Sequence, residues 1–438
     1  MLIYSNYISP RLQYITDFIC QEICMDDFVL TTDKARFLNH AGAKINYSKE
    51  HISDGEFQIT NVSILFENEI NVQQIDCFEL NGQKCFFKTN GHFPFDIFAA
   101  CFYLLSRYEE YLPHEQDEYG RFAHTSSLAY QQGFLNLPII DLWLEDFKLS
   151  LHDKFPTLKF KKSTFNFTPT YDIDMAWSFM HKGWNRTIGA TLKDLISMKW
   201  GRVLKRNRVL TGIETDPYDV YAWLDELHDK YNLSPHYFFL IAEKNNQYDK
   251  NISIDSKAMM DLIIQHDKKY KVGIHPSWQS GNNIGIIKNE ILQLVKIAEE
   301  KIDTSRQHYI RFTLPETFQL LIKAGIQTDY SMGYGSINGF RASTSKYFYW
   351  YDLKNELQTN LLLAPFCFMD ANSFYEQKLT AEQALDELRH YFQVLKSLNG
   401  NLVTVWHNTI LGSDSMFKDW KELYEKFVCE VAEYINKQ

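Results

Sequence analysis

The chain has 438 residues, of which 45% are hydrophobic and 23% are charged, a composition typical of a globular protein large enough for two or three domains. Its 55 Asp and Glu residues outnumber its 45 Lys and Arg residues, and the net charge of −10 argues against nucleic acid as the main partner. Seven scattered cysteines without a Cys-x-x-Cys pair imply neither a disulfide framework nor a zinc knuckle, so we expect a reducing compartment.

No targeting segment is expected at the N-terminus, because its first residues lack a basic stretch followed by an apolar run. The most apolar run, 95–105, is interrupted by Asp96 and is shorter than the roughly 20 residues that span a bilayer. We therefore expect a cytoplasmic protein without a membrane span. The sequence leaves its oligomeric state open.

Residues 1–155 form the first predicted unit, a smaller α+β domain of unknown function. Helical spacing runs through 10–24, short strands are expected at 57–66 and at 77–88 around an Asn-Gly turn, and a helix begins near Asp96. Nothing in this unit has catalytic spacing, so we expect a scaffold or recognition role. Charged residues at the end of the last helix are expected to form a solvated or ion-paired surface: Arg107, Glu109 and Glu110.

Residues 164–438 form the second predicted unit, in which short apolar strands alternate with amphipathic helices. Such alternation predicts parallel strands covered by helices, arranged as a barrel or as an open doubly wound sheet. The basic insertion 181–212 is expected to be a surface excursion over one rim, in the manner of a lid. The predicted strands are 164–171, 237–242, 271–274, 303–308, 326–329, 361–368 and 401–406. The predicted helices are 217–231, 255–268, 284–301, 314–324, 380–397 and 415–436.

Two aspartates mark the end of the first of these strands, in the segment Pro169-Thr-Tyr-Asp-Ile-Asp174. Charge at the edge of a core costs several kcal/mol unless it is paired, hydrogen-bonded or bound to metal. One Asp could cap the following segment while the other faces water. Alternatively, one could bind a cation while the other acts as a base. The Asp-x-Asp pattern alone leaves both interpretations open.

Further polar side chains follow the other predicted strands. In parallel α/β folds the carboxyl ends of the strands meet at one rim, where catalytic residues collect. Each residue alone could be structural, but their joint occurrence indicates a site. His236, in contrast, precedes its strand and is expected at the opposite rim. The strand-end residues are Asp172, Asp174, His275, Arg306, His308, Asp329, Asp370 and His407.

The order of these motifs resembles that of the polysaccharide deacetylases, the family 4 carbohydrate esterases. The resemblance covers roughly residues 164–438 and implies a distorted (β/α)7-type barrel. The whole chain resembles a bacterial deacetylase-like group with an uncharacterised N-terminal domain, through Phe93-Pro-Phe-Asp-Ile-Phe98 and Leu105–Leu112. The motifs that carry the resemblance are Tyr171-Asp-Ile-Asp174, His275, Arg306-x-x-Tyr309, Asp329 and Val405-Trp-His407.

The resemblance implies metal-assisted hydrolysis of an N-acetyl group on a sugar. It makes Asp174 and His275 ligands of a divalent metal, which we expect to be zinc. It makes Asp172 the base that deprotonates the attacking water. It gives Arg306 the role of orienting Asp172, with Asp329 steadying Arg306.

Hydrolysis of an N-acetyl amide needs both a Lewis acid and a general acid. An amide carbonyl is a poor electrophile, so a Lewis acid must polarise it and lower the pKa of the attacking water. The amine leaves poorly without a proton, and the resemblance assigns the delivery of that proton to His407.

The third metal ligand is not settled by the sequence. The family usually places a second histidine four residues after the first, where this chain has Gln279. Imidazole suits zinc better than an amide oxygen does, and His308 near the same rim could supply the missing nitrogen. Either Gln279 or His308 could therefore complete the metal shell.

Three functions follow from these observations. The first is a metal-dependent N-deacetylase acting on an amino sugar or glycan precursor. The second, motivated by Gln279, is a catalytically degenerate relative that binds a glycan without hydrolysing it. The third is hydrolysis of a non-sugar amide, since the aromatic residues near the rim suit either sugars or flat heterocycles. Those aromatic residues are Trp278, Tyr309 and Trp406.

Overall fold

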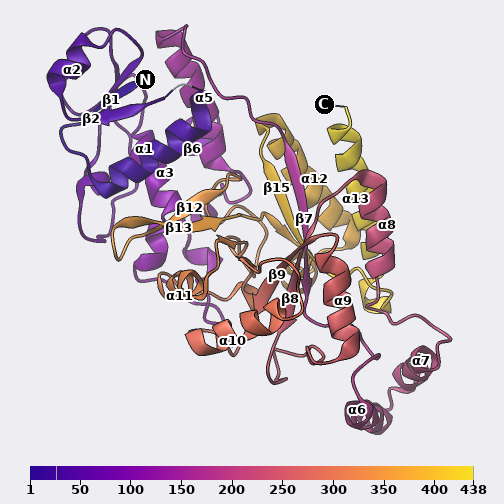
Figure 1. Cartoon of the computed structure of the whole chain (residues 1–438). Helices are drawn as coiled ribbons and strands as arrows, with labels where there is room; N and C mark the ends of the chain where they lie inside the picture. The colour runs from indigo at the N-terminus through magenta and orange to yellow at the C-terminus, as the bar shows by residue number, and fades with distance from the viewer. Residues whose placement is uncertain (26, 438) are drawn as a thin grey trace.

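The computed structural model describes residues 1–25 and 27–437 and shows a mixed α/β molecule built on a large parallel-rich sheet (Figure 1). Nine strands pair in the order β12-β13-β11-β10-β9-β8-β7-β15-β14, and every neighbouring pair is parallel except β12–β13. The strands are β7 (Asn166–Ile173), β8 (His236–Ile241), β9 (Lys271–Pro276), β10 (Thr304–Ser305), β11 (Thr328–Asp329), β12 (Phe348–Asp352), β13 (Leu357–Leu363), β14 (Phe368–Met369) and β15 (Asn401–His407).

The predicted alternation of strands and helices is confirmed in this part of the chain. Helix α12 packs on β15, while α9 and α10 pack on β9, so helices cover the buried parallel strands. The helices are α8 (Tyr221–Tyr231), α9 (Lys257–Asp267), α10 (Ile284–Val295), α11 (Glu316–Ala324), α12 (Ala381–Leu398) and α13 (Trp420–Ile435). Short helical turns are η4 (His308–Ile310), η5 (Asn372–Glu376) and η6 (Ser415–Phe417).

The sheet has two ends, at β12 and at β14. Within the described residues no strand pairing joins these two ends, so the pairings define a parallel-rich sheet, and closure into a barrel stays a prediction. The predicted strand 361–368 is wrong as one element: β13 ends at Leu363 and β14 begins at Phe368, with Pro365 between them. Proline has no N–H to donate, which suits a break between two strands.

Residues 1–155 hold a second, four-stranded parallel sheet in the order β2-β1-β3-β4, together with the predicted Asn-Gly hairpin β5–β6. The predicted strand 57–66 is wrong beyond Ile59, because Ser63–Phe66 forms a 3-10 turn, η1. The strands are β1 (Leu2–Tyr4), β2 (Val29–Thr31), β3 (Lys44–Tyr47), β4 (Phe57–Ile59), β5 (Phe78–Leu80) and β6 (Gln83–Cys85). The helices are α1 (Pro10–Ile23), α2 (Lys34–Asn39), α3 (Ile97–Leu105), α4 (Leu128–Gln131) and α5 (Ile139–Lys154), with turns η2 (Tyr108–Tyr111) and η3 (His124–Ser126).

Helix α3 lies at the centre of this N-terminal part. Asp96 caps its first turn by accepting a hydrogen bond from the Ala99 N–H, and it also accepts from the Tyr47 hydroxyl and the Val62 N–H. All nine residues of the helix are buried. The helix is apolar on every side, as expected for an element enclosed by its neighbours.

The two parts of the chain share one hydrophobic core, which runs from Ile3 to Val431. Polar contacts also join them: Arg11 donates two hydrogen bonds to Glu356, and Asp141 accepts from Ser345. Because residues of both parts belong to the same core, the structure does not separate the two predicted domains, and the division into 1–155 and 164–438 stays a prediction.

Between β7 and α8 the chain forms a helical hairpin, α6 (Trp184–Ile196) and α7 (Trp200–Leu210), which projects from the body of the molecule (Figure 1). It occupies the insertion that the sequence predicted as a surface excursion. No helix among the described residues is long and apolar enough to cross a membrane.

Candidate active site with a metal-binding triad

Strand β7 delivers the two aspartates of the site. Asp172 is its penultimate residue and is 2% exposed, while Asp174 follows the strand directly and its side chain is 27% exposed. Successive side chains of a strand point to opposite faces, so residues two apart point the same way. Both carboxylates line one cavity of about 670 Å³ at the carboxyl end of the sheet.

His275 comes from the end of β9. Its Nδ1 lies 2.6 Å from the carbonyl oxygen of Arg306, which can only accept, so Nδ1 carries the hydrogen. The neutral ring then presents the lone pair of Nε2, which lies 3.2 Å from Asp174 Oδ1. This backbone contact thus fixes the tautomer that can bind a metal.

His308 begins the turn η4, just beyond β10. Its Nδ1 lies 3.0 Å from the carboxylate of Asp249, and its Nε2 lies 3.6 Å from Asp174 Oδ1. Burial opposes a charge on this ring, but Asp174 and Asp249 raise the pKa of His308 to about 9. The surroundings of His308 therefore favour the protonated, positively charged ring when no metal is bound.

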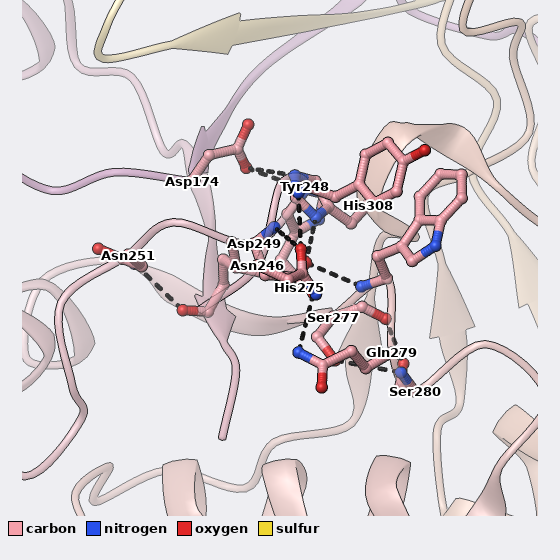
Figure 2. A network of polar contacts seen from close by, with 12 residues as sticks. Asp174, Asn246, Tyr248, Asp249, Asn251, His275, Ser277, Gln279, Ser280 and His308 are labelled. Carbon is pink, nitrogen blue, oxygen red and sulfur yellow. Dashed lines mark hydrogen bonds and ion pairs between the residues drawn. The ribbon is translucent and has the colours of Figure 1, made fainter. Parts of the chain in front are cut away.

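These three side chains form a set that could hold a metal ion (Figure 2). One donor atom from each of Asp174, His275 and His308 lies within 4.8 Å of the other two. Asp174 Oδ1 is buried and faces the Nε2 atoms of both histidines, at 3.2 Å and 3.6 Å, so its negative charge is directed at the point where a cation could bind. Burial raises the pKa of Asp174, but His308 and His275 hold it well below its usual range. Two imidazoles and one carboxylate are a donor set that suits a catalytic zinc with an open fourth position.

Gln279 lies away from this triad. Its amide nitrogen donates to the Lys244 carbonyl oxygen at 2.6 Å and lies 3.4 Å from Asp249 Oδ2. Figure 2 shows Gln279 on the side of Asp249 that faces away from Asp174. Between the two candidates for the third ligand, the geometry favours His308.

Asp172 lies beside the triad and is held by Arg306. The guanidinium Nη1 donates to Asp172 Oδ1 at 2.8 Å, and Nε donates to the Tyr330 carbonyl oxygen at 3.1 Å. The guanidinium also lies 4.6 Å from the centre of the Phe238 ring. Gly273 makes room for that ring, because a Cβ at this position would lie 2.7 Å from it. Arg306 is therefore fixed from several sides and can orient the Asp172 carboxylate.

The role of Asp329 in steadying Arg306 stays a prediction. No ion pair between Asp329 and Arg306 is found in the described part of the chain. Instead, Asp329 accepts hydrogen bonds from the Ser305 hydroxyl at 2.7 Å and from the Ser331 N–H at 2.8 Å. The Ser331 hydroxyl in turn accepts from the Gln307 N–H. Because Ser305 and Gln307 flank Arg306, any steadying of Arg306 by Asp329 passes through the backbone rather than a direct contact.

His407, the last residue of β15, faces the triad from the other side of Asp174. Its Nε2 lies 3.8 Å from Asp174 Oδ2, and its Nδ1 lies 2.6 Å from Asp370 Oδ1. Asp370 also accepts a hydrogen bond from the His407 N–H, so ring and backbone are both fixed. Burial opposes a charge on the ring, but Asp370, followed by Asp174 and Asp172, raises the pKa of His407 to about 10.

Aromatic side chains form one wall of the cavity. Tyr119, Tyr248 and Tyr309 line the cavity. Trp278, which is not one of the lining residues, stacks on Tyr248 with ring centroids 3.9 Å apart and meets Tyr309 edge-on at 5.6 Å. Tyr119, from the N-terminal part, lies 5.3 Å from Tyr309. Arg121 donates to the Tyr309 carbonyl oxygen at 2.7 Å. Residues 1–155 thus contribute directly to the cavity that contains the triad.

The structure brings together most of the strand-end residues that the sequence singled out. Asp172, Asp174, His275, His308 and His407 all line the cavity, whereas Arg306 and Asp329 are buried behind it. His236 opens β8 at the amino end of that strand, as predicted. Trp406 is buried and does not reach the rim.

Sequence reasoning missed several residues of the site. Asp249 lies in the loop 242–256, where only its position shortly after a strand end could have drawn attention to it. Tyr119 and Arg121 lie in a part of the chain that shows no catalytic pattern, and their role follows from packing between distant segments.

Comparison with known proteins gives a match to one family model, described as "Family of unknown function (DUF7033)", over residues 1–156. A search of curated proteins finds no match. Among solved structures, the chain is similar to a protein assigned as a polysaccharide deacetylase from Mycobacterium smegmatis, with 14% identity and a TM-score of 0.40, over 62% of this chain and 85% of that one. It is also similar to the polysaccharide deacetylase of Bacillus cereus, with 10% identity and a TM-score of 0.29, over 61% and 88% of the two chains. Both similarities are distant.

Proposed function

We propose that this chain is a metal-dependent hydrolase that removes N-acetyl groups from an amino sugar or a glycan precursor. One observation carries the proposal: Asp174 Oδ1 lies 3.2 Å from His275 Nε2 and 3.6 Å from His308 Nε2, so that three donor atoms from distant segments converge on one point. A divalent metal, which we propose to be zinc, would be held by these three residues. When bound, it would polarise an amide carbonyl and make water more acidic.

Asp172 is the proposed general base. Its Oδ1 is held by Arg306, while Oδ2 lies 3.9 Å from His275 Nε2 and is directed toward the triad. In this position it can accept the proton of a water molecule that attacks the acetyl carbon. The ion pair with Arg306 keeps the carboxylate oriented during this transfer.

His407 is the proposed general acid. Asp370 fixes its Nδ1, so Nε2 is directed toward Asp174 and the cavity. The raised pKa keeps this ring protonated at neutral pH, so that Nε2 can donate a proton to the departing amine. Asp172 and His407 line the same cavity, so a bound amide could be reached by both the base and the acid.

The cavity supports the proposed substrate class. A volume of about 670 Å³ and a wall that includes the rings of Tyr119, Tyr248 and Tyr309 suit a sugar, whose apolar face packs on aromatic side chains. We also propose the finer form of the fold, a distorted barrel in which the sheet curves around this cavity. The proposed setting is the cytoplasm, in agreement with seven scattered cysteines that form no Cys-x-x-Cys pair.

Acetate release tests the proposal. Zinc-loaded protein is incubated with N-acetylglucosamine oligomers, nucleotide-linked N-acetyl sugars and a panel of non-sugar amides. We expect release from at least one sugar, and we expect Asp172→Asn to lower it by about 10²–10⁴-fold without loss of metal. Glycan binding without acetate release would instead support the degenerate alternative. Turnover of non-sugar amides alone would support the third candidate function.

A further inference from the structure

The hairpin formed by α6 and α7 exposes a large amount of apolar surface. Of the 22 large hydrophobic side chains that are exposed in the described residues, nine lie between positions 184 and 213. Trp184 and Ile196 are more than 80% exposed. The remaining seven are Ile188, Leu192, Met198, Trp200, Leu204, Leu210 and Ile213. Such a concentration marks an interaction surface rather than scattered surface residues.

Helix α6 has its polar and apolar faces reversed relative to an ordinary surface helix. Its polar residues Thr191 and Asp194 face α7, where both interact with the guanidinium of Arg206. Its apolar residues at intervals of four face outward, from Trp184 through Ile188 and Leu192 to Ile196. A helix in contact with water normally turns the apolar face inward. The outward face of α6 therefore needs an apolar environment.

The hairpin is also strongly basic. Residues 182–213 contain eight Lys and Arg and one Asp, a net charge of +7 in a chain whose total is −10. Arg202 and Arg208 are more than half exposed. A partner that covers this surface must therefore offer both apolar groups and negative charge. Two copies of the hairpin facing each other would instead bring like charges together.

Within the fold, the hairpin is anchored beside the cavity. The carboxylate of Asp216 accepts hydrogen bonds from the backbone N–H groups of Ser178, Phe179 and Met180, where the chain leaves the body of the molecule. Met175, three residues earlier, lines the cavity. The hairpin therefore extends from the same rim as the triad, and the buried carboxylate of Asp216 holds the segment from which it starts.

We propose that α6 and α7 form a membrane-docking hairpin that lays its outward apolar face in the interface of a bilayer carrying anionic lipid headgroups. The acyl chains would cover the apolar residues, and the basic side chains would pair with the headgroups. The tryptophans that begin each helix, Trp184 and Trp200, suit the boundary between headgroups and acyl chains. The proposal does not depend on the hydrolase activity, since neither helix supplies a residue to the triad.

Vesicle co-sedimentation tests this inference. The full-length protein is mixed with vesicles of phosphatidylcholine alone or with 30% phosphatidylglycerol (about a third anionic lipid). We expect the protein to sediment with the anionic vesicles and to be released by high salt. The combined substitutions Trp184→Ser, Ile188→Ser and Ile196→Ser should lower the bound fraction by about tenfold. Lys199→Gln with Arg202→Gln should weaken binding to anionic vesicles only.

A matched control removes exposed apolar side chains elsewhere. Val72→Ser with Leu149→Ser changes residues that are 79% and 65% exposed and lie outside the hairpin, and it should leave sedimentation unchanged. The far-ultraviolet circular dichroism spectrum and the urea unfolding midpoint should be the same for all variants, which shows that each one folds whether or not the chain is a hydrolase. Equal sedimentation of the wild type and the triple Ser variant would overturn the proposal. So would a wild-type dimer that the triple variant converts to monomer, with no vesicle binding.

Discussion

Three histidines of the cavity share one arrangement. In each, Nδ1 is fixed by an oxygen acceptor, so that Nε2 is directed toward Asp174: His275 by the Arg306 carbonyl, His308 by Asp249 and His407 by Asp370. The expected roles depend on position. His275 and His308 lie in the set that could hold a metal ion, with a carbonyl or a carboxylate behind the ring, whereas His407 lies outside that set and the buried Asp370 favours a protonated ring that can act as an acid.

The pH dependence of hydrolysis follows from this pairing. Asp370 raises the pKa of His407, so Asp370→Asn should lower that pKa. A general acid must be protonated, and activity falls as the pH rises through its pKa. The basic limb of the pH profile of kcat/KM should therefore move to lower pH in Asp370→Asn, while Gln279→Ala leaves it in place. A basic limb at the same pH in both variants would exclude His407 as the acid.

The strand-end residues of the site were accessible to sequence analysis because parallel strands end at the same rim. Asp172, Asp174, His275 and His407 follow buried apolar runs, and the physical cost of placing charge there signals a function. Asp249 could not be found in this way, since the long loop that carries it has no periodic pattern. The contacts of Asp329 depend on side-chain geometry that no spacing encodes.

At the scale of elements, the loop between β8 and α9 supports the triad. Asp249 accepts hydrogen bonds from the Trp278 N–H and the Asn246 side chain, and it faces His308 Nδ1. It therefore joins the loop, the end of β9 and His308, a proposed metal ligand. Partners of this kind commonly affect metal affinity as strongly as some direct ligands do.

Replacing Asp249 should weaken metal binding. We expect Asp249→Asn to lower zinc affinity by about 10–100-fold, because His308 loses the carboxylate that orients and polarises its ring. Competition with a chromophoric chelator measures this change. Gln279→Ala, which removes a neighbour of Asp249 but no ligand of the triad, should change zinc affinity much less. Unchanged affinity in Asp249→Asn would remove Asp249 from the site.

The segment that carries Tyr119 is expected to control substrate binding. Tyr119→Ala removes a ring that extends the aromatic wall, and we expect KM for the sugar substrate to rise about tenfold, equivalent to about 1.4 kcal/mol. The value of kcat and the metal content should stay close to wild type. Tyr130→Ala, at an exposed ring of the same N-terminal part, is the control. If both variants have the same KM, Tyr119 does not contact the substrate.

The elements themselves were predicted with uneven success. Helices α8 to α13 have apolar faces long enough to establish a period, and each lies within or close to its predicted range, although α10 ends at Val295 rather than at 301 and α13 begins at Trp420 rather than at 415. Strands β10 and β11 contain two residues each, too few for any periodic pattern, and were predicted as longer segments. Pairing with long neighbours, rather than local preference, defines such short strands.

At the scale of the whole molecule, a buried ion-pair network joins the two parts of the chain. Arg107 and Arg341 both pair with Glu110, and all three side chains are at most 3% exposed. The sequence predicted charged pairing here but placed it on the surface. Burial raises the pKa of Glu110, but the two guanidinium groups lower it to about 2.

Removing the carboxylate should destabilise the fold. Glu110→Gln leaves two buried guanidinium groups without their shared anion, and we expect the free energy of unfolding to fall by about 3–5 kcal/mol at pH 7. The folded pKa lies below the usual value of Glu, so this stabilisation is present above about pH 4.5 and is lost as the pH falls toward 2. The difference between wild type and Glu110→Gln in urea unfolding should therefore shrink from pH 7 to pH 3.

Glu145→Gln provides the comparison, because it breaks an exposed pair with Lys148 that contributes about 0–1 kcal/mol. An effect of Glu110→Gln as small as that of Glu145→Gln would show that the network does not stabilise the molecule.

Everything proposed for catalysis depends on distant segments meeting around one cation. The oxygen of Asp174 and the nitrogen of His275 lie 3.2 Å apart although 101 positions separate them in the chain. Metal analysis of purified protein after zinc loading and removal of unbound metal tests this convergence most directly. We predict about one zinc per chain in the wild type and in Gln279→Ala, and a large loss in Asp174→Ala, His275→Ala and His308→Ala. Wild-type protein without zinc, or equal zinc content in all five proteins, would contradict the account.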